Sequence, residues 1–351
     1  MIDEAKLNAF IGKILGDLGG ALSTPLVRMG DKLGLYKAFN EQGPMTPAEL
    51  AAKTNVAERY AREWLSHQAA SGYLEYEPAT GKFTLPPEQA LVFAEPDSPV
   101  YLQAAFDMVA VMLDNQARVE PAFRSGTGVG WGDQSQCLFC TTGRFFRVGY
   151  HNNLVGSWPP ALEGVAAKLE SGAKAADVGC GHGFSTIMMA NAYPKSTFVG
   201  YDFHPASIEQ ARVHAEQHGA TANAKFEVAM ASDFPGKDLD LVTFFDCLHD
   251  MGDPVGAARH VRETLKPDGS WMIVEPAAGD RLEDNLNPVS RMYYAGSTMI
   301  CIPTSLDQPV GAAFGAQAGF AKLSAAIVQG GFGKVRKATE TPFNMVLEAR
   351  P

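Results

Sequence analysis

The stretch AADVGCGHG, residues 175–183, decides how this sequence folds. Its first residues are mostly apolar and are bounded by glycine, which is typical of a short buried strand. Gly179, Gly181 and Gly183 then predict a tight turn whose bare backbone can approach a ligand closely. A helix that follows this turn would point its N-terminal N–H groups at the same ligand. The stretch therefore indicates a strand–turn–helix unit of a nucleotide-binding sheet.

After Pro159 the chain alternates strands with helices, which is the pattern of a parallel sheet covered on both faces. The predicted strands span residues 175–178, 197–201, 225–229, 239–245, 270–274, 334–338 and 343–348. Too few residues separate the last two strands for a crossover helix, so these two would pair antiparallel. The predicted fold class is α/β, a Rossmann-like sheet of seven strands with an antiparallel final hairpin.

A carboxylate follows the second predicted strand. Asp202 lies 19 residues after Gly183, where an acidic side chain can accept hydrogen bonds from both ribose hydroxyls of a nucleoside. This spacing suits several nucleoside cofactors. The dinucleotide fingerprint would place its third glycine at position 184, which is Phe184 in this chain. A nicotinamide-dependent oxidoreductase stays open as an alternative.

With these residues the chain resembles class I S-adenosylmethionine-dependent methyltransferases, whose first motif is an acidic residue followed by Gly-x-Gly-x-Gly. The resemblance extends through the acid after the second strand to the ends of the third and fourth strands. It implies S-adenosylmethionine as the cofactor. The cofactor-binding residues that it implies are Asp177, Gly179, Gly181, Gly183, Asp202, Phe203, Asp233, Phe234, Asp246 and Cys247.

The segment FDCLHDMGDP, residues 245–254, resembles the Leu-His-Asp segment of plant-type O-methyltransferases, which also carry an N-terminal winged helix. Over its length the chain also resembles bacterial winged-helix small-molecule methyltransferases. The resemblance implies that His249 is the general base for an acceptor hydroxyl, a role that suits a side chain titrating near neutrality. Glu275, at the end of the fifth strand, would orient the imidazole. Plant-type enzymes usually have tryptophan where this chain has Met251, and a structural histidine stays open as the alternative.

Two further segments are candidates for the acceptor pocket. Phe146 and Tyr150 lie just before the helix that leads into the sheet, and Met292, Tyr294 and Cys301 lie in the insertion before the final hairpin. These side chains predict a small, apolar acceptor, with ordinary packing as the alternative.

Cysteine and acid spacing predicts no metal site. Cys137 and Cys140 have zinc-ligand spacing without a second pair nearby, and Asp250 with Asp253 lacks a further ligand. Five cysteines are too few for a disulfide scaffold in 351 residues, which fits a reducing cytoplasm. The chain has neither the pattern of a signal peptide nor an apolar run long enough to span a membrane. We therefore expect a cytoplasmic protein with no membrane contact.

The N-terminal part has the pattern of a winged helix. A capping box at residues 46–49 begins one short helix, a second spans about residues 57–70, and residues 73–85 predict a hairpin. Residues 1–98 hold 9 Lys and Arg against 13 Asp and Glu, so the positive surface that binds nucleic acid is missing. Dimerisation or capping of an active site is the expected role, and a cofactor-sensing transcription regulator is the alternative.

The predicted organisation has three parts. These are a winged-helix dimerisation or cap domain over residues 1–98, a helical connector over 99–157, and an S-adenosylmethionine-binding methyltransferase domain over 158–351. The formal net charge of −10 also disfavours nucleic acid as a partner, so a small molecule is the expected substrate. Apolar helices within residues 10–40 have few partners in their own domain, which predicts a homodimer.

Overall fold

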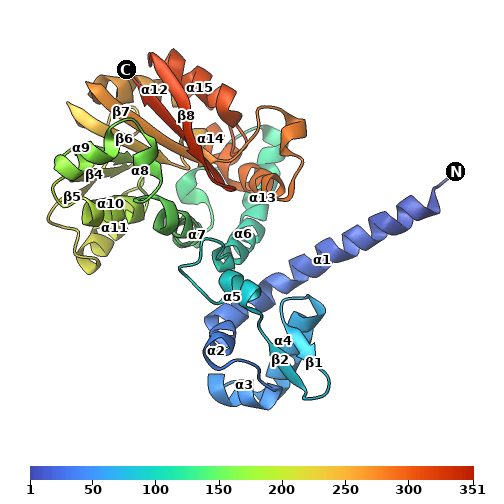
Figure 1. Ribbon diagram of the computed structural model, residues 1–351. Helices are drawn as coiled ribbons and strands as arrows, with labels where there is room; N and C mark the ends of the chain where they lie inside the picture. Colours follow the sequence, from blue (N-terminus) through green and yellow to red (C-terminus); the bar gives the residue numbers. More distant parts are fainter. The chain divides into compact units, whose positions relative to one another are not determined.

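The computed structural model describes all 351 residues, which divide into two compact units (Figure 1). Unit 1 spans Met1–Ala110 and unit 2 spans Val111–Pro351. The division falls inside helix α6, Gln103–Ser125. Each unit has a hydrophobic core of its own. This division describes only how the chain packs into units. The organisation into three parts therefore stays a prediction.

Unit 1 consists of helices and a short antiparallel ribbon. Its elements are α1 (Glu4–Lys32), α2 (Leu35–Gln42), α3 (Pro47–Thr54), α4 (Glu58–Ala70), β1 (Glu75–Glu77), β2 (Lys82–Thr84) and α5 (Pro87–Phe93). The expected capping box is present, since Thr46 Oγ1 accepts from the Glu49 N–H and the Glu49 carboxylate accepts from the Thr46 N–H. The antiparallel pairing of β1 with β2 completes the helix–helix–wing order of a winged helix.

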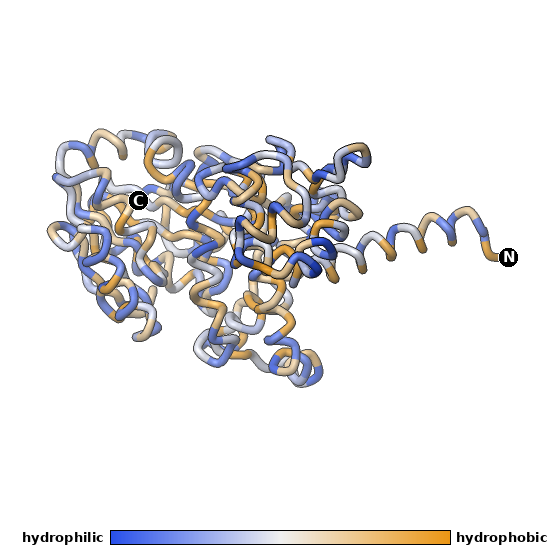
Figure 2. The backbone as a smooth tube through the Cα atoms, turned by 90° about the horizontal axis from the view of Figure 1, so that it is seen from below, coloured by the Kyte–Doolittle hydropathy of each residue, from blue (hydrophilic) through white to orange (hydrophobic).

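The first helix, α1, is mostly exposed. Leu7, Leu15, Leu18 and Leu22 all have large exposed fractions, and Figure 2 shows apolar residues recurring along the helix. The buried positions of α1 begin only at residue 23. In spite of its length, neither α1 nor any other helix has an apolar stretch that could cross a membrane.

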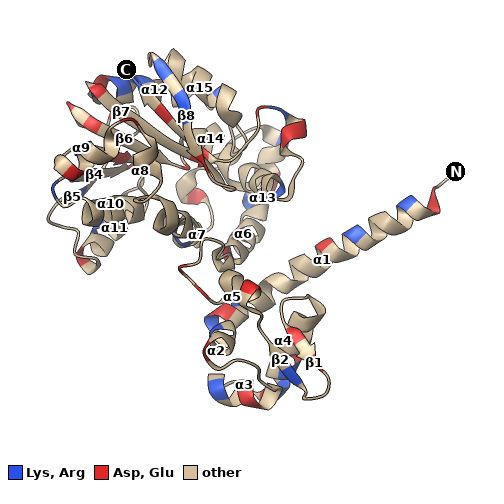
Figure 3. Cartoon of the chain, in the orientation of Figure 1, with Lys and Arg blue, Asp and Glu red and all other residues tan.

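The charges on α4 are paired within the helix. Arg59 contacts Glu63 and Arg62 contacts Glu58, each one turn away. Figure 3 shows acidic and basic residues interspersed along α3, α4 and the ribbon of unit 1. This mixture differs from the positive surface that a DNA-binding winged helix presents.

Unit 2 is built on one central sheet. After the end of α6, its helical elements are η1 (Trp131–Asp133), α7 (Leu138–Asn153), α8 (Trp158–Ala161), α9 (Val165–Ser171), α10 (Phe184–Ala192), α11 (Pro205–Gln217), η2 (Leu248–Asp250), α12 (Pro254–Thr264), η3 (Leu282–Asn285), α13 (Pro288–Gly296), the π-helical segment η4 (Ser297–Cys301), α14 (Ile302–Asp307) and α15 (Gly319–Gln329). Its strands are β3 (Lys174–Val178), β4 (Thr197–Asp202), β5 (Ala224–Val228), β6 (Leu239–Phe245), β7 (Leu265–Pro276), β8 (Lys334–Glu340) and β9 (Asn344–Arg350).

The seven strands lie in the order β5-β4-β3-β6-β7-β9-β8. The first five run parallel, and β9 pairs antiparallel with both β7 and β8. The predicted seven-stranded sheet with its antiparallel hairpin is confirmed. Strand β7 begins at Leu265, earlier than predicted, because residues 266–269 continue the strand through an irregularity in its pairing with β6 instead of forming a turn.

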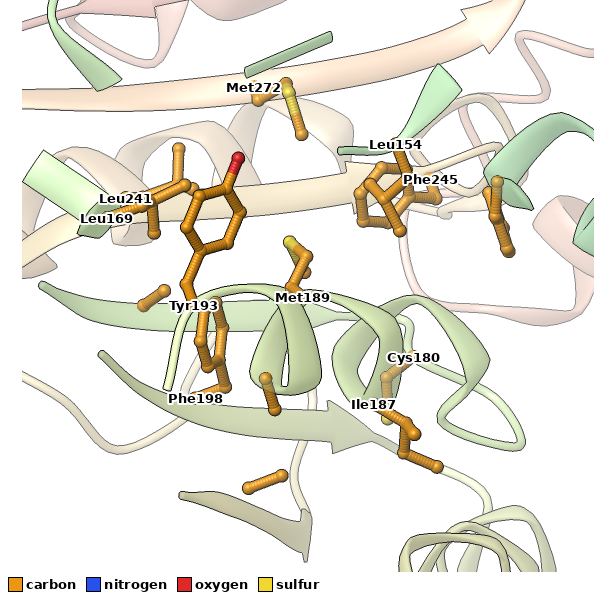
Figure 4. Close-up of a cluster of buried hydrophobic side chains, with 14 of the residues drawn as sticks. Leu154, Leu169, Cys180, Ile187, Met189, Tyr193, Phe198, Leu241, Phe245 and Met272 are labelled. Carbon is orange, nitrogen blue, oxygen red and sulfur yellow. The ribbon is translucent and has the colours of Figure 1, made fainter. Parts of the chain in front are cut away.

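Alternate residues of the central strands are buried on opposite faces of the sheet. Leu241 and Phe245 of β6 share one cluster with Ile187 of α10 (Figure 4). Val242 and Phe244 belong to a second cluster. Because β6 is buried on both faces, the residues that directly follow it have well-defined positions.

Candidate functional site

The carboxyl ends of β3, β4 and β6 meet where the strand order changes direction, which is where open α/β sheets bind ligands. The N–H groups of Gly179 and Cys180 donate to the Tyr201 carbonyl oxygen at 2.8 and 3.0 Å. The Gly181 N–H donates to Asp202 Oδ2 at 2.9 Å. The predicted glycine turn and the predicted acid after β4 are therefore in direct contact.

The three glycines of the turn have φ values of +74°, +52° and +78° for Gly179, Gly181 and Gly183. A Cβ atom at Gly179 would lie 2.8 Å from Cys247 Sγ, and one at Gly183 would lie 2.7 Å from the Phe226 ring. A Cβ atom at Gly181 would meet no atom within 4 Å. Packing thus requires glycine at two positions, whereas at the third the backbone is left open to a ligand.

Asp177 is buried at the end of β3. Its carboxylate accepts hydrogen bonds from Ser185 Oγ and Thr186 Oγ1, both at 2.6 Å, and from Thr243 Oγ1 at 3.0 Å. Burial raises the pKa of this carboxyl, and the three hydroxyl groups oppose that rise. Asp177 therefore ties β3 to the first turn of α10 and to β6.

A cavity of about 300 Å³ opens at this edge of the sheet. Eight of the predicted site residues line it: Phe146, Tyr150, Gly179, Gly181, Asp202, Phe203, Asp246 and Cys247. Nine lie outside its lining: Asp177, Gly183, Asp233, Phe234, His249, Glu275, Met292, Tyr294 and Cys301. The rest of the wall comes mainly from η1, α7, residues 229–232, residues 250–253 and residues 304–310.

Two predicted segments lie beside the cavity instead of in its wall. After β5, Ser232 lines the cavity, whereas Asp233 is exposed and Phe234 is buried in the core. In α13, Met292 and Tyr294 are partly exposed, with 40% and 36% of their surface accessible.

Asp202 and Asp246 are the two buried carboxylates that face the cavity beside the glycine turn. Asp202 Oδ1 accepts from the His204 N–H at 2.9 Å. Asp246 Oδ1 accepts from Asn344 Nδ2 at 2.9 Å, while its Oδ2 is buried without a hydrogen-bond partner. Burial raises the pKa of Asp202, and burial together with Glu275 raises the pKa of Asp246 well above its usual range. A cationic group bound at Asp246 would satisfy the unpaired oxygen and stabilise the ionised form.

His249 lies in η2, directly after β6, and is only 3% exposed. Its Nδ1 is hydrogen-bonded to Glu275 Oε2, and Glu275 Oε1 accepts from the Leu248 N–H at 2.9 Å. Its Nε2 lies 3.0 Å from Asp250 Oδ1. Burial lowers the pKa of His249, but the carboxylates of Asp250 and Glu275 outweigh burial and raise it well above its usual range. The imidazole is therefore held in its charged form by the two acids.

Cys301 completes a group of three possible metal ligands. Donor atoms of His249, Asp250 and Cys301 all lie within 4.8 Å of one another. Burial raises the pKa of the Cys301 thiol to about 12, so the thiolate that a metal needs is disfavoured. We assign no metal, because charge pairing accounts for the positions of His249 and Asp250.

Several lining residues were not predicted from the sequence. On α7, Phe139 lines the cavity in addition to the predicted Phe146 and Tyr150, and its ring stacks on His204 with the centroids 4.6 Å apart. Positions 139, 143, 146 and 150 share one helical face, so this spacing was a usable signal. The lining residues 308–310 have no such periodicity, because they lie in an irregular segment.

A buried polar network supports the wall beside α7. Asn115 Nδ2 donates to Gln134 Oε1 at 2.8 Å, and the Ser135 N–H donates to Asn115 Oδ1 at 2.7 Å. Gln134 Nε2 donates to Thr304 Oγ1 at 2.6 Å. These bonds join the middle of α6, the segment after η1, and α14 around the cavity.

Comparison with protein families identifies both parts of the chain. Residues 169–323 match the model described as "Methyltransferase domain", and residues 21–95 match the "Rv2258c-like winged HTH domain". The chain carries a methyltransferase domain that follows a winged helix in the sequence. The predicted resemblance and enzyme class are thereby confirmed for this methyltransferase domain, and S-adenosylmethionine is the cofactor of its family.

Curated relatives match the methyltransferase domain over part of their length. A ubiquinone biosynthesis O-methyltransferase of Xanthomonas euvesicatoria is 32% identical over 118 residues, which are 33% of this chain and 48% of that protein. One from Cereibacter sphaeroides is 33% identical over 98 residues, 28% of this chain and 39% of that protein. The chain thus spans less than half the length of these relatives.

Solved structures share the fold over the whole chain. An O-methyltransferase family protein from Burkholderia thailandensis superposes with a TM-score of 0.69 at 17% identity, covering 100% of this chain and 98% of that one. Human N-acetylserotonin methyltransferase, in complex with SAM, has a TM-score of 0.69 at 18% identity and 97% coverage of both chains. At these identities the likeness establishes the fold.

Proposed function

We propose that the protein transfers a methyl group from S-adenosylmethionine to a hydroxyl group of a small, apolar acceptor. The observation that carries the proposal is the cavity at the ends of β3, β4 and β6, where a bare glycine turn lies beside two buried carboxylates. The two curated relatives and the Burkholderia thailandensis neighbour are named O-methyltransferases, which supports a hydroxyl acceptor.

The residues around the cavity fit such a cofactor. Asp202 would bind the ribose hydroxyls, and the unpaired Oδ2 of Asp246 would bind the amino group of the methionyl part. Residues 229–232 and Phe203 would flank the adenine ring. The bound sulfonium supplies an already activated methyl group, so the chain has chiefly to orient the acceptor and exclude water.

We assign removal of the acceptor proton to His249. Glu275 holds Nδ1, which leaves Nε2 as the nitrogen that accepts the proton. Asp250 lies against this nitrogen and also lines the cavity, so the acceptor hydroxyl has to replace Asp250 at Nε2. Loss of that carboxylate lowers the pKa of His249 toward neutrality, where the imidazole is an effective base.

For the N-terminal part, residues 1–98, we propose a role in homodimerisation or in capping the active site. The exposed apolar face of α1 supports a second copy of the chain as its partner. The ion pairs within α4 disfavour DNA binding.

Calorimetric titration tests the cofactor assignment. We expect the protein to bind S-adenosylmethionine and its demethylated product, and Asp202→Ala to weaken binding by about 2–4 kcal/mol through loss of charge-assisted hydrogen bonds. Glu216→Ala, on the exposed side of α11, is the matched control and should bind like the parent protein. Absence of binding at millimolar concentration in the parent protein would refute the proposed function.

A further inference from the structure

We propose that this site accepts uncharged or cationic aromatic molecules and rejects acceptors that carry a negative charge. The inference rests on the proposed function, because it concerns the acceptor of the same cavity. It follows from the charges and the aromatic rings of the cavity wall.

Apart from His182, Tyr150 and two cysteines, every ionisable side chain that lines the cavity is an aspartate. Asp202, Asp246, Asp250 and Asp253 contribute to the wall, and no lysine or arginine does. Burial lowers the pKa of His182, so this side chain is neutral at neutral pH. The wall therefore offers no lysine or arginine to a carboxylate or sulfonate, and His249, which lies outside the wall, is already paired with Asp250 and Glu275.

Two of the four acids have no role in binding the cofactor. Asp250 faces the cavity next to His249, where the acceptor hydroxyl would bind. Asp253 Oδ1 accepts from the Gly256 N–H at 2.8 Å, so this side chain caps the N-terminus of α12 and is held in place at the wall. An anionic acceptor would thus meet two carboxyl groups, those of Asp250 and Asp253, at its own end of the cavity.

The Arg147 side chain interacts with an aromatic ring of the wall and does not itself line the cavity. The Arg147 guanidinium is 5.9 Å from the centroid of Phe184, and it is Phe184 that lines the cavity. Phe139, Phe146 and Tyr150 add three more rings to the wall. An anion placed against these rings loses water without gaining an ionic partner, whereas a neutral or cationic ring system packs there at no such cost.

A pair of fluorescent probes that differ by one sulfonate tests the inference directly. N-phenylnaphthylamine is neutral, and anilinonaphthalene sulfonate is its anionic counterpart. Both would be titrated into the full-length protein saturated with S-adenosylhomocysteine. We expect the neutral probe to bind at least about tenfold more tightly.

Val310 provides variants that make the measurement specific for this cavity. It lines the cavity and is 77% exposed, so a longer side chain fits at the rim. Val310→Lys adds a positive charge and should reduce the ratio by which the neutral probe binds more tightly than the sulfonate probe. The matched control Val310→Gln adds similar length without charge and should leave the preference unchanged.

Three results would overturn the inference: equal affinities, tighter binding of the sulfonate, or binding of neither probe. The inference would also be overturned if Val310→Lys and Val310→Gln changed the preference equally, because the preference would then not depend on charge. S-adenosylhomocysteine binding is measured first. If that binding fails, the proposed function fails, while the same two probes on the unliganded protein still measure the charge preference of the cavity.

Discussion

Asp202 and Asp246 both end a parallel strand, yet their surroundings differ. Both oxygens of Asp202 accept backbone N–H groups, from Gly181 and His204. Asp246 has φ +51° and one oxygen without a partner. A left-handed backbone at a non-glycine residue costs free energy, and such strain concentrates at ligand sites. The unpaired oxygen is therefore the more direct indication of a cationic ligand.

At His249 we predict loss of turnover without loss of cofactor binding. His249→Ala or His249→Asn removes the proposed base, so methyl transfer should fall by at least about 100-fold. The affinity for S-adenosylmethionine should stay nearly unchanged, because His249 lies outside the cavity wall. Product formation measured by chromatography, with calorimetry on the same samples, checks both parts. Full activity in either variant would assign the histidine a structural role.

Asp250→Asn should shift the pH dependence of the reaction. Burial lowers the pKa of His249 and the Asp250 carboxylate raises it, so removing that charge lowers the pKa. The neutral imidazole then persists to lower pH, and the acidic limb of the rate profile moves to lower pH. Initial rates across the acidic range check this shift. In the control Asp253→Asn the acidic limb should stay at the same pH. An acidic limb that moves to higher pH in Asp250→Asn would contradict the proposed pairing of Asp250 with His249.

The turn between β3 and α10 links cofactor binding to packing. In Gly183→Ala the new Cβ would meet the Phe226 ring at 2.7 Å and Ala211 Cβ at 2.9 Å. We expect the free energy of unfolding to fall by about 1–2 kcal/mol from the left-handed backbone and about 1–3 kcal/mol from overpacking. Denaturant unfolding measures this loss.

Gly181→Ala is the control for that substitution. It has the same backbone strain but no clash, so it should cost only about 1–2 kcal/mol of stability. Its Cβ would point into free space beside the cavity. We therefore expect the free energy of cofactor binding to be weakened by more than the free energy of unfolding is lowered. Equal losses of stability in the two variants would mean that packing against Phe226 does not matter.

The segment after α14 brings strained backbone against η2. Val310 and Ala313 have φ values of +73° and +48°. The Ala312 N–H donates to the Gly252 carbonyl oxygen at 2.8 Å, and the Gly315 N–H donates to that of His249 at 3.3 Å. These bonds hold the strained segment against the residues that follow β6 and so help to position the proposed base.

For the whole molecule we predict a homodimer that depends on α1. Leu7, Ile11, Leu15, Leu18 and Leu22 share one exposed face of this helix and leave a large apolar surface uncovered. The double substitution Leu15→Glu with Leu18→Glu should reduce the mass to that of a monomer while the chain stays folded, because both side chains are exposed within a single chain.

Light scattering coupled to gel filtration measures that mass. Ala9→Glu, on the opposite face of α1, is the matched control and should stay dimeric. A monomeric parent protein at micromolar concentration would contradict the prediction.

The amino-acid sequence by itself determined the sheet, the glycine turn and the acids at its edge. These features depend on local patterns, because strand alternation, glycine spacing and the residue after a strand are all read within a few positions. The family match of residues 169–323 confirms that these patterns belong to a methyltransferase domain.

Only the tertiary structure decided which side chains line the cavity. It buries His249 between Glu275 and Asp250 and makes Asp250 the residue in the wall. It leaves Met292 partly exposed and brings Val310 to the rim. The physical reason is that a cavity wall is formed by segments far apart along the chain, and their packing depends on the shapes of all their neighbours, which no local pattern records.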